Sequence, residues 1–356
     1  MNKTAKRKLD HIKICTQERV ESITSCFQDI KIIHKATPEI DKRDIDLTLS
    51  FLGRRLQMPF MIASMTGGHP GTIKVNESLA KAAEEMQIGI GVGSQRAALE
   101  DPEQEDSFRV MRDNAPNAFI YGNIGAAQLE EYGVEGVEKA VDMIDANAVA
   151  VHLNFLQEAI QPEGEANAKG VLSSIKDLSS SVKVPVIVKE TGAGISFSVA
   201  EELAKAGVSA IDVGGVGGTS WAGVEVYRAI AEGDKLLENM GRLFWDWGLP
   251  TPVSIAECAS VGPPIIASGG IRTGLDMAKS ITLGADLCSA ALPFVKPALD
   301  GPDQIIEILK RMEEELRVAM FLSGSSNVEE LKKAQIVILG ETRDIILQRG
   351  RMKLNE

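Results

Sequence analysis

The chain alternates between short apolar segments and longer amphipathic ones. Eight short segments are apolar at consecutive positions, and each ends in glycine or polar residues. A strand with both faces buried has this composition, which is typical of a parallel sheet covered by helices. The predicted strands are Pro59–Met65, Ile88–Ser94, Ala118–Ile124, Ala148–Asn154, Val184–Glu190, Ala210–Gly215, Pro264–Gly270 and Ala285–Ala291.

Apolar residues recur with a helical period between these strands. Eight strand–helix repeats over about 250 residues predict an α/β fold, the (β/α)8 or TIM barrel. A doubly wound sheet is the alternative, but it usually has fewer strands. Helices are expected over Asn76–Met86, Val199–Ala206, Gly274–Leu283 and Asp303–Leu322.

Two segments are additions to a minimal barrel: an N-terminal extension and a long insertion after the sixth strand. We predict an N-terminal extension over 1–58, the barrel over 59–325 and a helical C-terminal tail over 326–356. Residues 216–263 form a long insertion after strand six and hold all three tryptophans. Long loops at the C-terminal face of a barrel usually shape the site. The tryptophans could contact substrate there. The equal alternative is that they serve packing or an oligomer contact.

Charge and cysteine content exclude several protein classes. With 38 Lys+Arg against 50 Asp+Glu, the net charge is −12, so we expect neither nucleic acid nor membrane as a partner. The four cysteines lack metal-site spacing, which favours reduced thiols. We find neither an apolar run of about 18 residues nor a secretory signal at the start, and expect a cytoplasmic protein.

Barrel enzymes place their sites at the C-terminal ends of the strands. The predicted strand ends are mostly small or polar residues, which allow backbone N–H groups to approach a phosphorylated ligand. ASGGIRTG at 267–274 and SAALP at 289–293 fit a phosphate site formed by the last two loops, although simple glycine turns are the alternative.

Lys189 ends a predicted buried strand, where a lone ammonium group is costly. It could form a Schiff base, an ion pair, or a positive charge beside a flavin ring. The glycine-rich strand ends and phosphate loops favour the flavin, because a cation near the ring stabilises its anionic reduced form.

Polar residues after strand four suggest a diphosphate site. His152 and Asn154 share one face of their strand, and Glu158 is the best carboxylate for Mg²⁺ bridging phosphates. A structural histidine is the alternative for His152. Arg7-Lys8 and Arg96 are candidate phosphate ligands in this acidic chain, although Arg7-Lys8 alone would also suit a solvated tail.

Six motifs stand out along the chain: MTGG at 65–68, GVGSQR at 91–96, HLNFLQE at 152–158, VKETGAGIS at 188–196, GGVGGTSW at 214–221 and ASGGIRTG at 267–274. They resemble the motifs of the type 2 isopentenyl diphosphate isomerases, which are FMN-dependent (β/α)8 enzymes. The resemblance extends from RKLDHI at 7–12 to about residue 325. One departure is Gly214, where many members have serine, which removes a side-chain hydrogen bond to FMN and leaves the backbone to serve.

The resemblance implies a role for each matching residue. Glu158 would bind Mg²⁺, and Gln157, His152, Asn154 and Lys189 would serve catalysis. Substrate would contact Arg7, Lys8, Ser94, Gln95, Arg96, His152, Asn154 and Gln157. FMN would contact Ser64, Met65, Thr66, Gly67, Ser94, Asn123, Lys189, Thr219, Gly270, Ile271, Arg272, Ala290 and Ala291.

The implied reaction is a redox-neutral 1,3-proton shift that converts isopentenyl diphosphate to dimethylallyl diphosphate for isoprenoid biosynthesis. Reduced FMN is implied as the active form, with NAD(P)H as reductant, in a homo-oligomer (tetramer or octamer). One alternative is another FMN barrel oxidoreductase, such as a 2-hydroxy-acid oxidase with net hydride transfer. That enzyme needs a late His/Arg pair, whereas all four histidines lie in the first half of the chain. A non-catalytic phosphate-ligand sensor is the other alternative.

Overall fold

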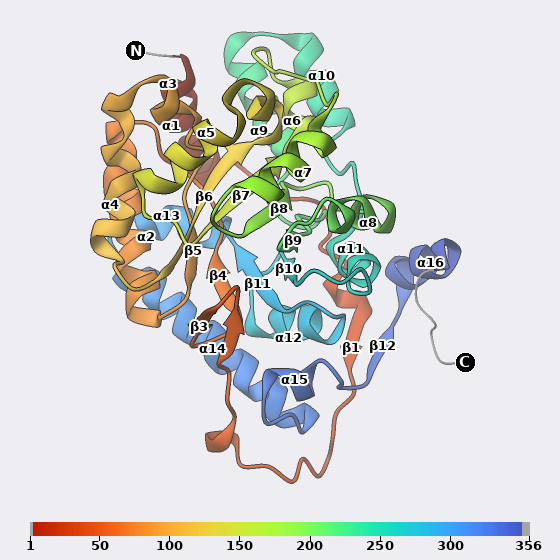
Figure 1. Cartoon of the computed structure of the whole chain (residues 1–356). Helices are drawn as coiled ribbons and strands as arrows, with labels where there is room; N and C mark the ends of the chain where they lie inside the picture. Colours follow the sequence, from red (N-terminus) through yellow and green to blue (C-terminus); the bar gives the residue numbers. More distant parts are fainter. Residues whose placement is uncertain (1–2, 351–356) are drawn as a thin grey trace.

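Eight parallel strands close into a barrel in the computed structural model, which describes residues 3–350, with side chains from residue 7 onward (Figure 1). Each strand coincides with one of the eight apolar segments, so the predicted (β/α)8 fold is confirmed. The strands neighbour one another in chain order, and the last pairs with the first. They are β4 (Phe60–Ile62), β5 (Gly89–Gly91), β6 (Phe119–Gly125), β7 (Ala148–Leu153), β8 (Val186–Glu190), β9 (Ala210–Asp212), β10 (Ile265–Ala267) and β11 (Leu287–Ala290).

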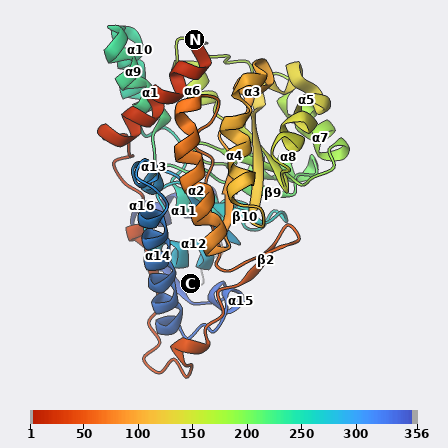
Figure 2. The ribbon, with the colours of Figure 1, turned by 90° about the vertical axis from the view of Figure 1, so that its left-hand side faces the viewer.

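Helices surround the barrel, and all four helices expected from the sequence are present. The long α14 runs along α2 and α12, and its buried stripe includes Ile305, Leu309 and Met312 (Figure 2). The helices that connect successive strands are α2 (Ile73–Met86), α4 (Asp106–Asn114), α5 (Leu129–Met143), α7 (Val171–Ser181), α8 (Phe197–Lys205), α11 (Thr251–Cys258) and α12 (Gly274–Thr282), and α14 (Asp303–Ser323) follows the last strand.

Further helices lie in the loops and at the two ends of the chain. Several gather on the side of the barrel where the strands end, at the top of Figure 1. Those drawn at the top are α1 (Lys3–Gln17), α3 (Arg96–Glu100), α6 (Phe155–Ile160), α9 (Trp221–Glu232) and α10 (Lys235–Leu243). The others are α13 (Leu292–Ala298), α15 (Val328–Leu331) and α16 (Gly340–Arg349). Short 3-10 turns occupy Phe27–Asp29, Lys42–Asp44, Pro70–Thr72, Pro102–Gln104 and Ala126–Gln128.

The N-terminal end of the barrel is filled by side chains. The hairpin of β2 (Leu49–Phe51) and β3 (Arg54–Leu56) covers this end, and Phe51 packs edge-to-face on Phe119 with ring centroids 5.7 Å apart. Phe51 belongs to the same buried cluster as inward residues of the strands. Any large cavity must therefore open at the other end.

A strand of the N-terminal extension pairs with a strand of the C-terminal tail beside the barrel. Strand β1 (Ile30–Ile32) pairs antiparallel with β12 (Ile336–Ile338), so the tail after residue 325 contains a strand between helices α15 and α16 and is not purely helical. Periodicity missed β12 because three residues of an isolated pair carry too little pattern. The division into 1–58, 59–325 and 326–356 stays a prediction.

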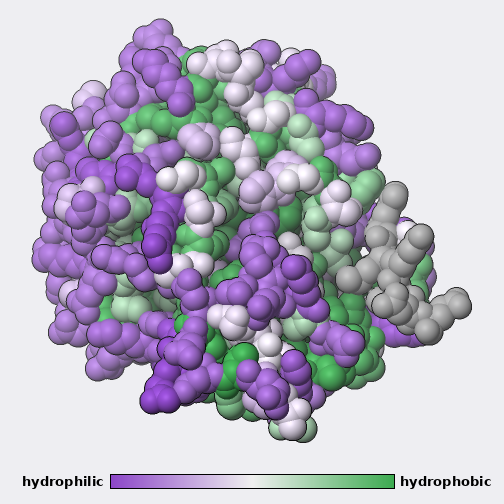
Figure 3. All heavy atoms as spheres, turned by 60° about the horizontal axis from the view of Figure 1, so that its bottom comes forward, coloured by the Kyte–Doolittle hydropathy of each residue, from purple (hydrophilic) through white to green (hydrophobic). Residues whose placement is uncertain are grey.

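The surface opposite the strand ends carries mainly hydrophilic side chains interspersed with apolar ones (Figure 3). Within residues 3–350, every helix is too short or too polar to cross a bilayer. Cys15, Cys26, Cys258 and Cys288 are all free thiols.

Candidate functional site

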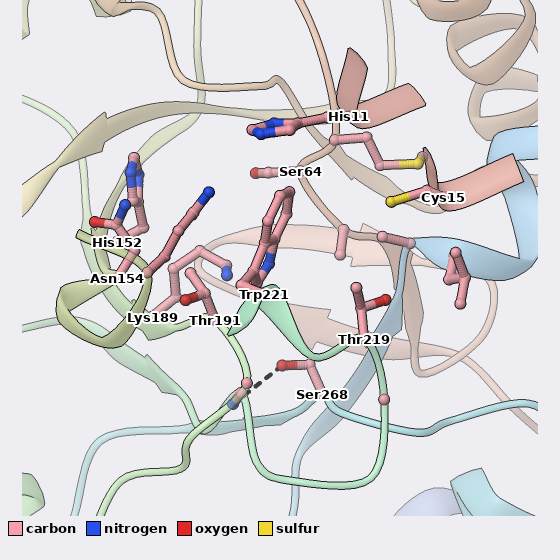
Figure 4. A pocket seen from close by; sticks show the side chains of 18 of the residues that line it. His11, Cys15, Ser64, His152, Asn154, Lys189, Thr191, Thr219, Trp221 and Ser268 are labelled. Atoms are coloured by element: carbon pink, nitrogen blue, oxygen red, sulfur yellow. Dashed lines mark hydrogen bonds between the residues drawn. The ribbon is translucent and has the colours of Figure 1, made fainter. Parts of the chain in front are cut away.

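A large pocket opens where the barrel strands end. It encloses about 1570 Å³ of space between atoms, part of it continuous with solvent. Alternation along the strands turns Asn123, His152, Lys189 and Ser268 inward, and their side chains reach the pocket. Lys189 projects into its centre between His152 and Ser64, and His11 of α1 lies above (Figure 4).

Most of the residues that the sequence predicted as site residues line this pocket. They come from α1 and from the ends of all eight barrel strands, although they are spread over most of the chain. The lining includes Arg7, Lys8, Ser64, Met65, Thr66, Ser94, Arg96, Asn123, His152, Asn154, Gln157, Glu158, Lys189, Thr219, Gly270, Arg272, Ala290 and Ala291.

Three predicted residues lie outside the lining. The side chain of Gln95 is fully buried, and its amide donates to the Ala140 carbonyl and accepts from the Asn123 N–H, so it supports β6 instead of facing a substrate. Ile271 is also fully buried. A Cβ on Gly67 would lie 2.2 Å from the Phe108 ring, so this glycine makes room for core packing.

His152 is held as a neutral imidazole. Burial, with the nearby positive charges of Lys189, Lys8 and Arg7, lowers the pKa of His152 to about 3. Its Nδ1 lies 2.9 Å from Asn123 Oδ1. With the amide oxygen as acceptor, Nδ1 donates and Nε2 is left as an acceptor, so His152 can receive a hydrogen bond but is a poor acid.

Gln157 is anchored by a buried glutamate that the sequence did not reveal. The Gln157 Nε2 group donates to Glu225 Oε1 at 2.8 Å, and Arg228 donates to Glu225 Oε2 at 2.7 Å. His11 Nε2 lies 3.6 Å from the same carboxylate. These contacts, Arg228 and His11 included, lower the pKa of Glu225 and keep it an anion, although its burial opposes this. The carboxylate thus fixes which way the Gln157 amide faces.

The Glu225 interaction depends on the insertion after β9, which folds back over the pocket. Trp221, at the start of α9, lines the pocket, and its ring packs edge-to-face on His11 with centroids 5.1 Å apart. Trp245 packs instead on Tyr227 of α9. The sequence pattern did not indicate that Glu225 belongs to the site, because one acidic residue in an amphipathic helix is usually exposed.

Glu158 is oriented by three donors. Asn154 Nδ2 donates to Oε1, while Gln161 Nε2 and the Glu165 N–H donate to Oε2, at 2.7–2.8 Å. A carboxylate held in this way can offer its remaining lone pairs to a cation that a substrate phosphate also binds. Within the described residues, no three His, Cys, Asp or Glu side chains converge as a preformed metal cage.

The basic residues at the pocket mouth are balanced by acidic ones. Arg96 donates to Glu100 and Glu165 at 2.7 and 2.9 Å, and Arg7 lies 3.6 Å from Glu163. Burial, together with Arg7, lowers the pKa of Lys8 to about 7. Arg272 donates to Glu21 at 2.6 Å. Three basic side chains, Arg7, Lys8 and Arg96, line the mouth on the side of α1 and α3.

Glycines bring backbone into the floor of the pocket. Gly270 has φ +86°, and a Cβ there would lie 2.4 Å from the Gly217 carbonyl oxygen. A Cβ on Gly214 would lie 2.3 Å from the Glu190 carbonyl, and its N–H donates to Ser268 Oγ at 3.1 Å (Figure 4). Glycine is thus required at 214 for space, whatever its contact with FMN.

The pocket fits a large, polar, phosphorylated ligand. Among residues 7–350, the buried hydroxyl oxygens of Ser64, Thr66 and Ser289 form no hydrogen bond. All three residues line the pocket, and buried hydroxyl groups normally have partners. These hydroxyl groups, the glycine loops at 214–218 and 269–270, and the Lys189 ammonium group match the polar edges and phosphate of FMN.

Comparisons with known proteins agree with this pocket. The family model for FMN-dependent dehydrogenases matches residues 13–118 and 154–338. The isopentenyl-diphosphate delta-isomerase of Methanococcoides burtonii is 60% identical over 350 residues, which cover 98% of this chain and 96% of the relative. The protein of the same name from Archaeoglobus fulgidus is 54% identical over 347 residues, covering 98% and 99%.

Solved structures show the same fold at low identity. A lactate oxidase of Pediococcus acidilactici superposes with a TM-score of 0.67 at 17% identity, covering 93% of this chain and 87% of that one. A mandelate oxidase with an FMN adduct gives 0.62 at 17%, covering 93% and 92%. The chain belongs to the FMN-dependent dehydrogenase family and, within it, to the isopentenyl-diphosphate delta-isomerases.

Proposed function

We propose that this protein is an FMN-dependent isomerase that converts isopentenyl diphosphate to dimethylallyl diphosphate without net oxidation or reduction. One observation carries the proposal: all but three of the residues that the family resemblance implied surround one pocket. The pocket is lined by apolar and polar groups together, as a ligand with a C5 alkenyl chain and a diphosphate requires.

FMN would occupy the inner part of the pocket. The hydroxyl groups of Ser64, Thr66 and Ser289 offer hydrogen bonds, and the loops with Gly218 and Gly270 leave room for a phosphate beside backbone. Bound and reduced, FMN supplies a group that can give and take a proton beside an alkene. Lys189 would favour the anionic reduced ring.

The diphosphate would lie at the pocket mouth. Arg7, Lys8 and Arg96 would bind its oxygens, since guanidinium groups match phosphate geometry, and Glu158 would hold Mg²⁺ against them. Because Arg96 is paired with Glu100 and Glu165, the substrate must compete with these carboxylates. Holding the diphosphate fixes where the alkene lies.

Gln157 and His152 would serve the proton shift. Protonating an unactivated alkene produces a tertiary cation, which requires a site that excludes water and positions each proton donor. Glu225 fixes the Gln157 amide, and the neutral His152 adds no positive charge beside that cation. Asn154 contacts Glu158 and so links the metal site to the same strand end.

The reaction needs reductant only to bring FMN into its active form. A hydroxy-acid oxidase, by contrast, consumes one oxidant for each product molecule. We expect the purified protein to be yellow and, under anaerobic reducing conditions with Mg²⁺, to form many product molecules for each NAD(P)H consumed. Stoichiometric consumption of NAD(P)H, or turnover by a colourless protein, would contradict the proposal.

Glu158 separates an isomerase from a phosphate-ligand sensor. Glu158→Gln should abolish turnover while FMN remains bound, because it removes the charge that holds Mg²⁺. Glu135→Gln, which changes an exposed glutamate paired with Lys139, is the matched control and should leave turnover unchanged. Unchanged turnover in Glu158→Gln would refute the metal assignment.

Several further features belong to the same proposal. Mg²⁺, NAD(P)H as reductant, a homo-oligomer of four or eight chains and a cytoplasmic location rest on the sequence and its family resemblance. Light scattering of the purified protein with and without substrate would measure the number of chains. No nucleic acid or membrane partner is proposed, in keeping with the net charge of −12.

A further inference from the structure

A buried carboxylate lies directly beneath the pocket and has no part in the chemistry described above. Asp212 is the last residue of β9 and is only 1% exposed. The Asp212 Oδ1 atom accepts a hydrogen bond from the Ser268 hydroxyl group. The Ser268 Oγ atom in turn accepts a hydrogen bond from the Gly214 N–H at 3.1 Å. Ser268 and Gly214 line the pocket, so Asp212 is one hydrogen bond away from its floor.

The cation nearest to this carboxylate in the strand register is Lys189. The two residues face each other across β8 and β9, and both side chains point into the barrel. Lys189 Nζ donates to the Glu190 carbonyl oxygen at 2.8 Å. The charge of Lys189 lowers the pKa of Asp212, although burial raises it more.

Glu190, the acidic residue that follows Lys189 in the chain, binds the backbone of its own loop. Its Oε2 accepts hydrogen bonds from the N–H groups of residues 191–194, with Thr191 N at 2.6 Å and Gly194 N at 3.2 Å. Those four donors belong to the loop after β8 and hold that loop in place. Asp212 therefore remains as the inward carboxylate that faces Lys189.

We propose that Asp212 is the counter-charge of Lys189 and thereby limits how strongly the pocket favours reduced over oxidised FMN. The inference rests on the proposed binding of FMN. Anionic reduced FMN carries one more negative charge than oxidised FMN, so Lys189 favours it and Asp212 opposes it. Both charges act through a poorly polarisable interior, where such effects are large.

Asp212→Asn tests this directly, because asparagine keeps the shape and the acceptor for Ser268 but removes the charge. We expect the ratio of reduced to oxidised FMN affinity to rise about tenfold, which raises the two-electron reduction potential by about 30 mV. The potential would be measured on the FMN-loaded protein by equilibration with a redox dye. An unchanged or lowered potential would overturn the inference.

Two controls separate charge from structure. Asp142→Asn makes the same charge change on the exposed face of α5, and its potential should equal that of the wild type. Ser268→Ala keeps the Asp212 charge, so its potential should shift less than that of Asp212→Asn; an equal shift in both would assign the effect to the hydrogen bond and refute the charge role.

If Asp212→Asn yields no FMN-loaded protein, Asp212→Ser carries the test with the same expected direction and the same contradicting result. Wild-type protein that fails to bind FMN would instead refute the proposed function. Wild-type protein that binds FMN and isomerises substrate, with no shift in either Asp212 variant, would refute only this inference.

Discussion

Individual side chains of the site owe their protonation to burial and neighbouring charge. His152 and Lys8 are both bases whose pKa values are lowered, His152 to about 3 and Lys8 to about 7. His152 is therefore neutral at every working pH, whereas Lys8 changes charge within the physiological range. The two residues should leave different traces in a pH profile.

The lowered pKa of Lys8 predicts weaker substrate capture in alkali. Lys8 is charged below about pH 7 and loses its charge above it, so kcat/KM for isopentenyl diphosphate should fall about tenfold as the pH rises from 6 to 9. Lys8→Arg, which stays charged, should remove this fall. A decline of equal size in Lys8→Arg would assign the titration to another group.

His152 should not appear in the same profile. Because it is already neutral, kcat between pH 5 and 8 should show no step that His152→Gln removes. Steady-state kinetics of wild type and variant over this range provide the measurement. A step near pH 6.5 that vanishes in the variant would show that His152 titrates with an ordinary pKa.

The contact between Gln157 and Glu225 predicts a defect in kcat. Glu225→Gln weakens the anchor of the Gln157 amide, so kcat should fall by about 100-fold, the size of an acid–base contribution, while KM changes little. Glu163→Gln, which removes a different partner of Arg228, is the control for loss of charge near α9. If KM rises while kcat stays constant, Glu225 acts on binding instead.

At the scale of elements, loops after the strands build the site. The loops after β9 and β10 touch: a Cβ on Gly218 would lie 2.6 Å from the Gly270 nitrogen. Helix α1 crosses from the N-terminal extension to contact α9 and α13 above the pocket. Scaffold strands thus hold segments that are far apart in the chain.

Gly270→Ala should remove FMN. A Cβ would lie 2.4 Å from the Gly217 carbonyl and would force the left-handed φ of +86° on alanine, so the two loops must move apart. We expect a colourless protein on purification. Gly233 has a similar φ of +75° but lies in open space, so Gly233→Ala should cost about 1 kcal/mol of stability and keep its FMN. Equal FMN content in both variants would show that the close contact between Gly270 and Gly217 is not needed for FMN binding.

Across the whole molecule, one closed barrel joins these loops into a cooperative unit. The main buried cluster runs from Phe27 near the N-terminus to Ile346 in α16. The β1–β12 pair ties the extension to the tail. A ligand that binds only the folded barrel should therefore stabilise the entire chain.

FMN should raise the stability of the folded protein by mass action. At 100 times its Kd, the gain is about 2.7 kcal/mol, which a thermal melt of apoprotein with added FMN would show as a higher Tm. Riboflavin, which lacks the phosphate that the glycine loops would hold, should raise Tm less. Equal shifts by the two compounds would argue against a phosphate site in these loops.

The sequence by itself determined the fold and most of the pocket lining. Strands buried on both faces leave a continuous apolar signal, and the barrel then places every strand end at one mouth. The sequence alone therefore assigned Lys189, His152 and Arg96 to the pocket that they line. The resemblance to a known family supplied their expected roles.

Only the tertiary structure decided which long-range partners act on those residues. Glu225 meets Gln157 across 68 positions, and Asp212 meets Ser268 across 56, so neither contact follows from local spacing. The sequence predicted that Gln95 faces substrate, but its side-chain amide oxygen accepts a hydrogen bond from the backbone of β6. Periodicity reports which face of an element is buried, whereas a buried charge finds its partner only when separate elements pack together.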